Sequence, residues 1–149
     1  MGDKEDQSQL DLRLFRIWMK ANTALSKNIL KDIESYNLNL EYFMILEFLY
    51  SKGPHPVQKI SETLSIPSGS ITYVVNKLER LGLVEKQQNS NDRRAFQVIL
   101  TQKGEEQFNE IFPKHVSTIS HNLSFISNEE KVVLIELLKK IGLGAQSLK

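Results

Sequence analysis

Hydrogen-bonding side chains between residues 68 and 77 have the chemistry needed to contact nucleic acid. Hydroxyl groups can bond to phosphate oxygens or base edges, an amide can pair with adenine through two hydrogen bonds, and an ammonium can neutralise a phosphate. A glycine among them, Gly69, would let the backbone approach DNA closely. The predicted contacts in this run are Ser68, Gly69, Ser70, Thr72, Tyr73, Asn76 and Lys77. The alternative interpretation is an ordinary solvated helix face.

Two adjacent arginines, Arg93 and Arg94, form a second candidate contact. They follow the turn-forming residues 89–92, so we expect them in a polar loop near the tip of a hairpin. An arginine there can enter a narrow minor groove, where the negative potential is enhanced. We expect Asp92 to pair with Arg94 and to orient its guanidinium. Asp92, Arg93 and Arg94 therefore complete the predicted DNA contacts, and the alternative is a solubilising surface turn.

The elements that must position these residues follow from the apolar pattern. Helical spacing of apolar residues predicts a helix over residues 67–81, which Pro67 can begin and Gly82 can cap. A short amphipathic helix precedes it, separated by a break at residues 65–67. After it, apolar and polar residues alternate on both sides of the polar loop, as in a hairpin. Helix, turn, helix, strand, basic loop and strand are the elements of a winged helix-turn-helix.

Long helices are predicted on both sides of this unit. An apolar stripe over residues 9–33, a helix capped by Asn39, a helix capped by Thr101 and a capping box at residues 127–130 define four more helices. We expect the last one to bury its apolar residues and to end at Gly142. The terminal helices carry more apolar surface than a small winged unit can cover, which favours a symmetric homodimer. The alternative is packing within one subunit.

Taken together, the pattern predicts a mainly α (α+β) fold, in one domain over residues 1–149. Residues 39–101 are the expected winged-helix DNA-binding region, and residues 9–36 and 102–145 the expected helical dimerisation region. Net charge supports this division, although the whole chain carries only +1. Residues 52–103 hold eight basic and four acidic residues, a net charge of +4, so the rest of the chain carries −3.

Several function classes have no support in the sequence. The chain has no cysteine, which excludes disulfides, thiolate metal sites and a cysteine redox switch. Neither catalytic motifs nor metal-ligand spacing are found, so we expect no enzyme activity, cofactor or metal. No membrane span and no signal peptide are recognised, and we expect a cytoplasmic protein. His55 is expected to be exposed, and His115 to lie on a helix surface or face a partner.

The chain resembles the MarR family, winged-helix regulators related to the multiple-antibiotic-resistance repressor. The matching residues are 46–50, 53–54, 60–62, 64–65, 70–72, 76–84, the N-D-R-R at 91–94 and the L-T-Q-K-G at 100–104. Residues 67–73 also resemble a branch that contains quinone-responsive repressors. The sequence departs from the family at Pro67, where serine is common, and at Tyr73, where a basic residue is frequent. Asn39 and Tyr42 stand where threonine and glutamine are frequent.

The resemblance implies a dimeric repressor that leaves an inverted-repeat operator in double-stranded DNA when a small molecule binds. We expect such a ligand at the junction between the dimerisation helices and the winged unit. The candidate ligand residues are Phe15, Trp18, Tyr42, Phe43, Phe112 and His115. Aromatic walls suit a phenolic or quinone-like ligand, although each ring could equally belong to the core. Two further alternatives are a winged-helix protein-interaction module and a DNA-binding regulator without a ligand.

Overall fold

Helices make up most of the described chain, and a small antiparallel sheet makes up the rest. The computed structural model describes residues 5–89 and 92–148, without the side chains at 89 and 92–95. The elements are α1 (Gln7–Glu34), α2 (Leu40–Lys52), β1 (His55–Pro56), α3 (Val57–Leu64), α4 (Ser68–Arg80), β2 (Val84–Asn89), β3 (Asp92–Leu100), α5 (Gln102–Asn122) and α6 (Asn128–Ser147). The predicted mainly α winged helix-turn-helix fold is confirmed.

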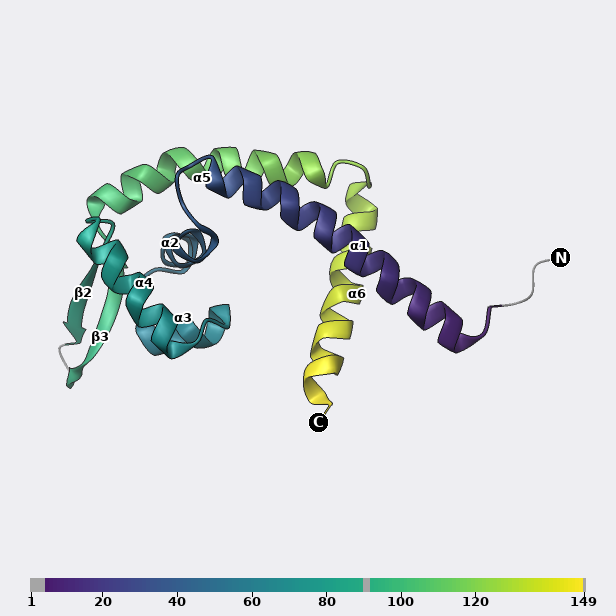
Figure 1. The fold of residues 1–149 in the computed structure, drawn as a ribbon, viewed down its shortest axis with the longest axis horizontal. Helices are drawn as coiled ribbons and strands as arrows, with labels where there is room; N and C mark the ends of the chain where they lie inside the picture. Colours follow the sequence, from purple (N-terminus) through teal and green to yellow (C-terminus); the bar gives the residue numbers. More distant parts are fainter. Residues whose placement is uncertain (1–4, 90–91, 149) are drawn as a thin grey trace.

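Two long helices set the shape of the molecule. The C-terminal half of α1 lies beside α5, and the α2–α4 helices and the sheet gather at one end of this pair (Figure 1). A hydrogen bond from Asn28 Nδ2 to Asn122 Oδ1, 2.7 Å long, joins α1 to α5. The N-terminal half of α1 and the whole of α6 extend away from the winged unit (Figure 1). Within the described residues, no helix has the length and apolar character that crossing a membrane requires.

The core lies where α2 meets the other elements of the winged unit. Five residues of α2 are buried, and they pack with the buried faces of α3, α4, β3 and α5. The buried face of α4 consists of Ile71, Val74, Val75 and Leu78, as the helical spacing predicts. Because one face of α4 is committed to this core, its opposite polar face must point to solvent.

Local signals explain where α4 begins and ends. Ser65 adopts a left-handed conformation (φ 55°) after α3, and the Ser61 hydroxyl donates to the Ile66 carbonyl oxygen across the turn. Pro67 then stands at the N-cap of α4, where its missing N–H costs nothing. At the other end, Gly82 has a φ of 77°, which glycine adopts without strain. The predicted bounds of this helix are therefore confirmed to within one residue.

The sheet has the order β1-β3-β2, and both pairings are antiparallel. Val84 pairs with Leu100 and Lys86 with Val98, with a register shift near the far end at residues 88–89. The two-residue strand β1 was not predicted from sequence. β2 and β3 form the wing beside α4 (Figure 1).

Hydrogen bonds join the start of α5 to the residues that follow α4. The Thr101 hydroxyl accepts from the Gly104 backbone N–H at 3.1 Å and donates to the Gly82 carbonyl oxygen at 2.5 Å. Lys103 Nζ donates to the Leu81 carbonyl oxygen at 2.9 Å. A Cβ on Gly104 would lie 2.2 Å from the Leu83 carbonyl oxygen, so the two segments touch too closely for any side chain there.

Two sequence expectations about local structure are wrong. α6 does not end at Gly142 but continues to Ser147, because a glycine inside a helix costs only about 1 kcal/mol and no proline follows. His55 is half-buried rather than exposed. Its ring packs against Phe48 with centroids 4.8 Å apart, and its Nδ1 lies 2.8 Å from the Gly53 carbonyl oxygen.

Candidate nucleic-acid interface

The polar face of α4 is exposed, as its sequence predicts. Ser68, Gly69, Ser70, Thr72, Tyr73 and Lys77 are all solvent-exposed, and Asn76 is half-buried. Thr72 Oγ1 donates to the Ser68 carbonyl oxygen at 3.0 Å. Tyr73, at 59% exposure, is the most prominent large side chain of this face. The face therefore offers hydroxyl, phenol and ammonium groups to a partner.

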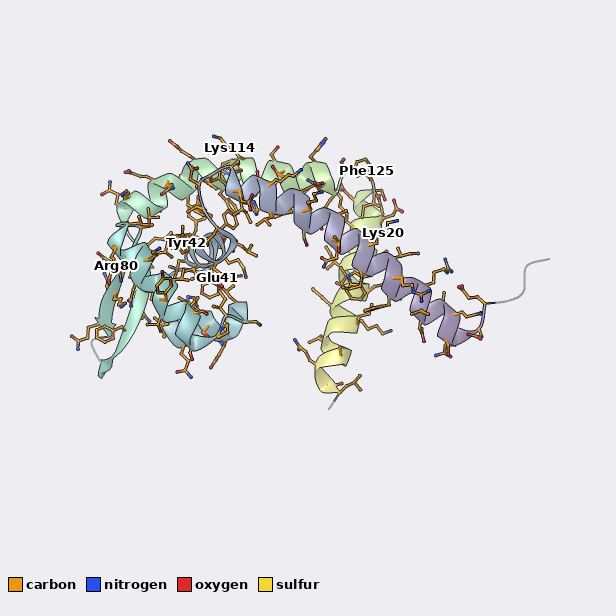
Figure 2. All side chains as sticks on the ribbon, in the orientation of Figure 1. Lys20, Glu41, Tyr42, Arg80, Lys114 and Phe125 are labelled. Atoms are coloured by element: carbon orange, nitrogen blue, oxygen red, sulfur yellow. The ribbon has the colours of Figure 1, made fainter. Side chains whose placement is uncertain are left out.

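Lys77 connects the exposed face of α4 to the beginning of α2. Its ammonium lies 5.6 Å from the centroid of the Tyr73 ring. Electrostatic interaction with Tyr42, followed by hydrogen bonding and electrostatic interaction with Tyr73, raises the pKa of Lys77 above its ordinary value. The shift favours the charged form that a lysine already has at neutral pH. Tyr42, which Figure 2 labels on α2, lies near the helix that carries the predicted DNA contacts.

Asn76 is connected to the wing. Its amide oxygen, Oδ1, accepts a hydrogen bond from Lys86 Nζ of β2 at 2.6 Å. The same ammonium lies 3.9 Å from Glu79 Oε1, one helical turn beyond Asn76. The helix and the wing are thus joined by a polar contact as well as by their shared core.

The wing carries the second set of predicted contacts. β3 begins at Asp92, so Arg93 and Arg94 belong to this strand and not to the loop before it. Asp92 pairs with Asn89 at the end of the hairpin. The side chains of Asp92, Arg93 and Arg94 lie outside the described residues, and the proposed ion pair between Asp92 and Arg94 stays a prediction.

The predicted ligand residues fall into two separate groups. Phe43 and His115 are buried, with ring centroids 4.5 Å apart, and Phe108 lies between Phe43 and Phe112. Tyr42 is half-buried against the same core. In contrast, Phe15 and Trp18 are exposed on the N-terminal half of α1. The structure of one chain therefore does not bring all six together.

Asp32 is a residue that the sequence reasoning missed. Its carboxylate accepts hydrogen bonds from Tyr36 Oη at 2.7 Å, Thr118 Oγ1 at 2.8 Å and His115 Nδ1 at 2.9 Å. Desolvation opposes ionisation of Asp32, but the hydrogen bonds from these three residues together lower its pKa. Desolvation and the nearby Asp32 carboxylate raise the pKa of Tyr36.

The position of His115 corrects a sequence expectation. Its side chain is only 9% exposed, so it does not lie on the helix surface. One sequence signal could have indicated a polar partner inside the fold. Asp32 stands between Ile29 and Ile33 on the apolar side of α1, and a buried carboxylate needs hydrogen-bond donors.

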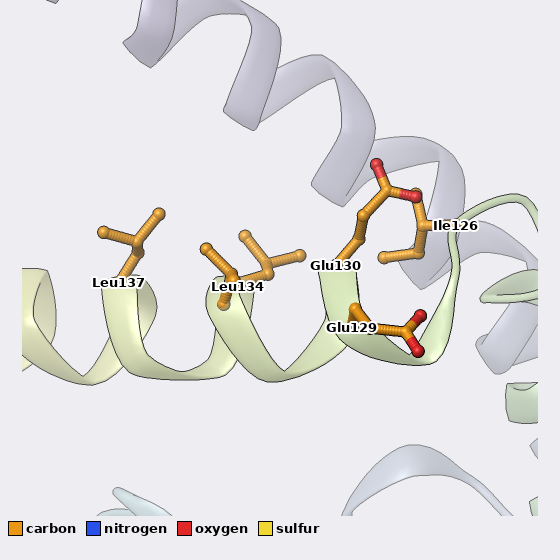
Figure 3. Close-up of a pocket in the computed structure, with 6 residues that line it drawn as sticks. Ile126, Glu129, Glu130, Leu134 and Leu137 are labelled. Carbon is orange, nitrogen blue, oxygen red and sulfur yellow. The ribbon is translucent and has the colours of Figure 1, made fainter.

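Exposed apolar residues cover the N-terminal half of α1 and most of α6. They are Leu10, Leu12, Leu14, Phe15, Ile17, Trp18 and Met19 on α1, and Val132, Val133, Leu134, Ile135, Leu137, Leu138, Ile141 and Leu143 on α6. The expectation that α6 buries its apolar residues is therefore wrong for the single chain, in which no described residue of α6 is buried. Figure 3 shows Leu134 and Leu137 lining a pocket at the start of α6, together with Ile126.

Comparison with known proteins identifies the family of these elements. The model of the MarR family matches residues 38–96, from two residues before α2 into β3. The HTH-type transcriptional regulator MhqR of Bacillus subtilis is 37% identical over 139 residues, which cover 93% of this chain and 96% of that protein. YkoM, an uncharacterised HTH-type transcriptional regulator of the same organism, is 35% identical over 144 residues, 97% of this chain and 94% of that protein.

Solved structures share the whole fold. AbsC, a MarR family transcriptional regulator from Streptomyces coelicolor, has a TM-score of 0.84 at 18% identity, covering 99% of this chain and 100% of that chain. A mutant of MarR from Escherichia coli, complexed with operator DNA, has a TM-score of 0.75 at 21% identity and covers 91% and 98%. NadR in complex with 4-hydroxyphenylacetate has a TM-score of 0.72 at 23% identity and covers 95% and 96%.

Proposed function

Because the chain belongs to the MarR family of transcriptional regulators, we propose that it is a homodimeric repressor of an inverted-repeat operator, released by a small aromatic ligand. A transcriptional regulator of this family is not an enzyme. The observation that carries the DNA-binding part is the exposed polar face of α4 beside the wing. The solved complex of the Escherichia coli MarR mutant with operator DNA supports the same use of this fold.

In this proposal the two DNA-contacting elements have separate roles. Thr72, Tyr73 and Asn76 of α4 face the major groove, and Ser68, Gly69 and Ser70 lie close to phosphates. Lys77, an exposed ammonium, neutralises a phosphate. Arg93 and Arg94 of the wing enter the adjacent minor groove, with Asp92 orienting Arg94. The net charge of +4 over residues 52–103 attracts DNA to this unit.

The exposed apolar faces of α1 and α6 support the homodimer. A soluble chain rarely leaves so many large apolar side chains uncovered, and a second copy of the same surface is the usual way to bury them. Phe125, between α5 and α6, is 87% exposed and belongs to the same end of the molecule (Figure 2). Two α4 helices in such a dimer would read half-sites about one helical turn apart.

The ligand is proposed to be a phenol or a quinone-like compound. The solved complex of NadR with 4-hydroxyphenylacetate shows that this fold accepts a phenolic ligand. In this chain Phe43, Phe112 and His115 lie where α1, α2 and α5 meet, and Tyr42 lies between this junction and Lys77. A ligand that binds better to a conformation with a different α4 spacing would release DNA.

A selection experiment tests the DNA-binding and dimer parts together. The purified protein is incubated with a pool of random-sequence DNA duplexes, and the bound fraction is sequenced over several rounds. An inverted repeat is expected to be enriched. If no sequence is enriched and binding is weak at low salt, the DNA-binding proposal is wrong, and a protein-interaction module is the remaining alternative for the exposed face of α4.

A separate experiment tests the proposed homodimer. Leu137→Glu places a charge on the exposed apolar face of α6, and sedimentation equilibrium is expected to show a shift from dimer to monomer. Glu41→Lys changes the charge of an exposed residue of α2 (Figure 2), outside the expected dimerisation region, and is expected to leave the dimer intact. A wild-type protein that is monomeric at micromolar concentration contradicts the dimer.

A further inference from the structure

The hydrogen bond between Lys86 and Asn76 determines which way the Asn76 amide points. A lysine ammonium has three donors and no acceptor. The atom of Asn76 that lies 2.6 Å from Lys86 Nζ must therefore be the amide oxygen, whichever way the amide would otherwise turn. The NH₂ group is then the other branch of the planar amide and takes no part in the bond to Lys86.

Lys86 is well placed to hold this orientation. It stands on β2 opposite Val98 of β3, whose side chain is fully buried, so its backbone is fixed by the sheet. Glu79 Oε1, 3.9 Å from the ammonium, provides a second partner on α4. With two partners on α4, the Lys86 charge is directed to the protein and is less available to a DNA phosphate than that of an unpaired lysine.

This orientation changes what Asn76 can recognise. Pairing with adenine through two hydrogen bonds requires the amide oxygen and the amide nitrogen to face the same base edge. The Asn76 oxygen has a second lone pair, but its bond to the Lys86 ammonium weakens it as an acceptor, so Asn76 presents chiefly its NH₂ group. A lone donor in the major groove matches an acceptor edge, and guanine, with N7 and O6, offers two acceptors.

We propose that Lys86 is a positioning residue that makes Asn76 a hydrogen-bond donor toward the operator, so that Asn76 selects guanine over adenine. This revises the expectation of a two-bond contact between Asn76 and adenine. The inference rests on the proposed DNA-binding function, and it adds a specificity role for a wing residue that itself does not read the base.

The test compares base preferences, which a merely structural role would not change. Wild-type protein, Lys86→Met, Lys86→Arg and Lys59→Met are each used to select from the same pool of random-sequence duplexes. At position 86, methionine removes the hydrogen-bond donor to Asn76, whereas arginine retains a donor. Lys59 is an exposed lysine of α3, and Lys59→Met controls for the loss of one positive charge. The result of each selection is a table of base preferences along the half-site.

The expected outcome is specific to one base pair. Wild type should prefer guanine at the position read by Asn76, and Lys86→Met should shift the guanine-to-adenine ratio there by about fivefold or more, the lower limit of a good base contact. Lys86→Arg should retain the wild-type preference. Lys59→Met should weaken binding to all sequences alike. Asn76→Asp, which keeps an acceptor for Lys86 but has no donor, should lose the guanine preference.

Two outcomes overturn the inference in different ways. If Lys86→Met weakens binding uniformly, as Lys59→Met does, Lys86 contacts a phosphate and does not position Asn76. If wild-type protein enriches no motif, the proposed DNA-binding function fails and this inference fails with it. Thermal unfolding of each variant, monitored by circular dichroism, establishes that the compared proteins are folded.

Discussion

The imidazole of His115 on α5 is hydrogen-bonded through Nδ1 to the carboxylate of Asp32 on α1, across 83 positions of sequence and a distance of 2.9 Å. Both side chains are nearly buried, with 9% and 10% of their surface exposed. The ring of Phe43 on α2 also packs against the His115 ring, with centroids 4.5 Å apart. This pair therefore holds three helices together at the junction between the winged unit and the long helices.

Removing the Asp32 carboxylate should destabilise the fold. Asp32→Ala leaves the donors of Tyr36, His115 and Thr118 without their common acceptor, and losing one member of a buried charged network costs about 3 kcal/mol. Chemical denaturation of the two proteins at neutral pH measures the difference. Asp11→Ala, at an exposed position of the same helix, should change the free energy of unfolding by less than about 0.5 kcal/mol.

The stabilisation from Asp32 should also depend on pH. Its pKa in the folded state is below the ordinary value of 3.8, so the folded protein binds fewer protons at this group than the unfolded chain does. The contribution is fully present above the ordinary value and is lost as the pH falls through the folded-state pKa. The difference in unfolding free energy between wild type and Asp32→Ala should therefore stay constant from pH 6 to about pH 4 and narrow below it. A difference that stays constant below pH 4 would contradict a lowered pKa of Asp32 in the folded state.

The sequence predicts α4 well because its signals are local. Pro67, the apolar spacing from Ile71 to Leu78, and Gly82 lie within 16 residues, and each acts on the backbone next to it. The Asp32–His115 pair cannot be found in this way, because no local pattern links two residues on different helices. The same limit applies to Lys86 and Asn76, whose contact depends on how the wing packs against α4.

The two terminal helices show a different limit of sequence reasoning. Their apolar stripes predict burial, but the spacing does not tell whether the same chain or a second copy covers them. A glycine alone was also insufficient evidence for a helix end at Gly142, because a stop signal needs a proline or a left-handed cap as well. Gly82, with its positive φ, is such a cap.

Gly104 should tolerate no side chain. Gly104→Ala would place a Cβ 2.2 Å from the Leu83 carbonyl oxygen, so the start of α5 would have to move away from the end of α4. A loss of about 2 kcal/mol in unfolding free energy is expected. Gly69→Ala is the matched control, because no heavy atom lies within 4 Å of its added Cβ. That variant should be as stable as wild type or up to about 1 kcal/mol more stable, yet bind DNA more weakly if the backbone approaches phosphates there.

Arg94 of the wing should contribute to DNA binding through counterion release. Arg94→Ala is expected to weaken operator binding and to lower the slope of log affinity against log salt by about one unit. Lys20→Ala, on the part of α1 that is distant from the wing in Figure 2, should change neither quantity. Asp92→Ala should also weaken binding, although it removes a negative charge, because Arg94 loses its orienting partner. Tighter binding by Asp92→Ala would exclude the orienting role.

The proposed aromatic ligand should bind at the junction of α1, α2 and α5. Its effect should be measurable at Trp18, which lies outside that junction. Titration of the protein–DNA complex with 4-hydroxyphenylacetate or 1,4-benzoquinone should release DNA, and Tyr42→Phe should reduce that release by removing one hydrogen-bonding hydroxyl. Trp18, the single tryptophan, is exposed on α1 and separated from the Phe43–His115 pair in one chain. In the proposed dimer it would lie at the apolar contact, so its fluorescence would report movement of the dimer helices. If neither compound releases DNA and the Trp18 emission is unchanged, the aromatic residues at this junction are core, and other compounds or protein abundance control the regulator.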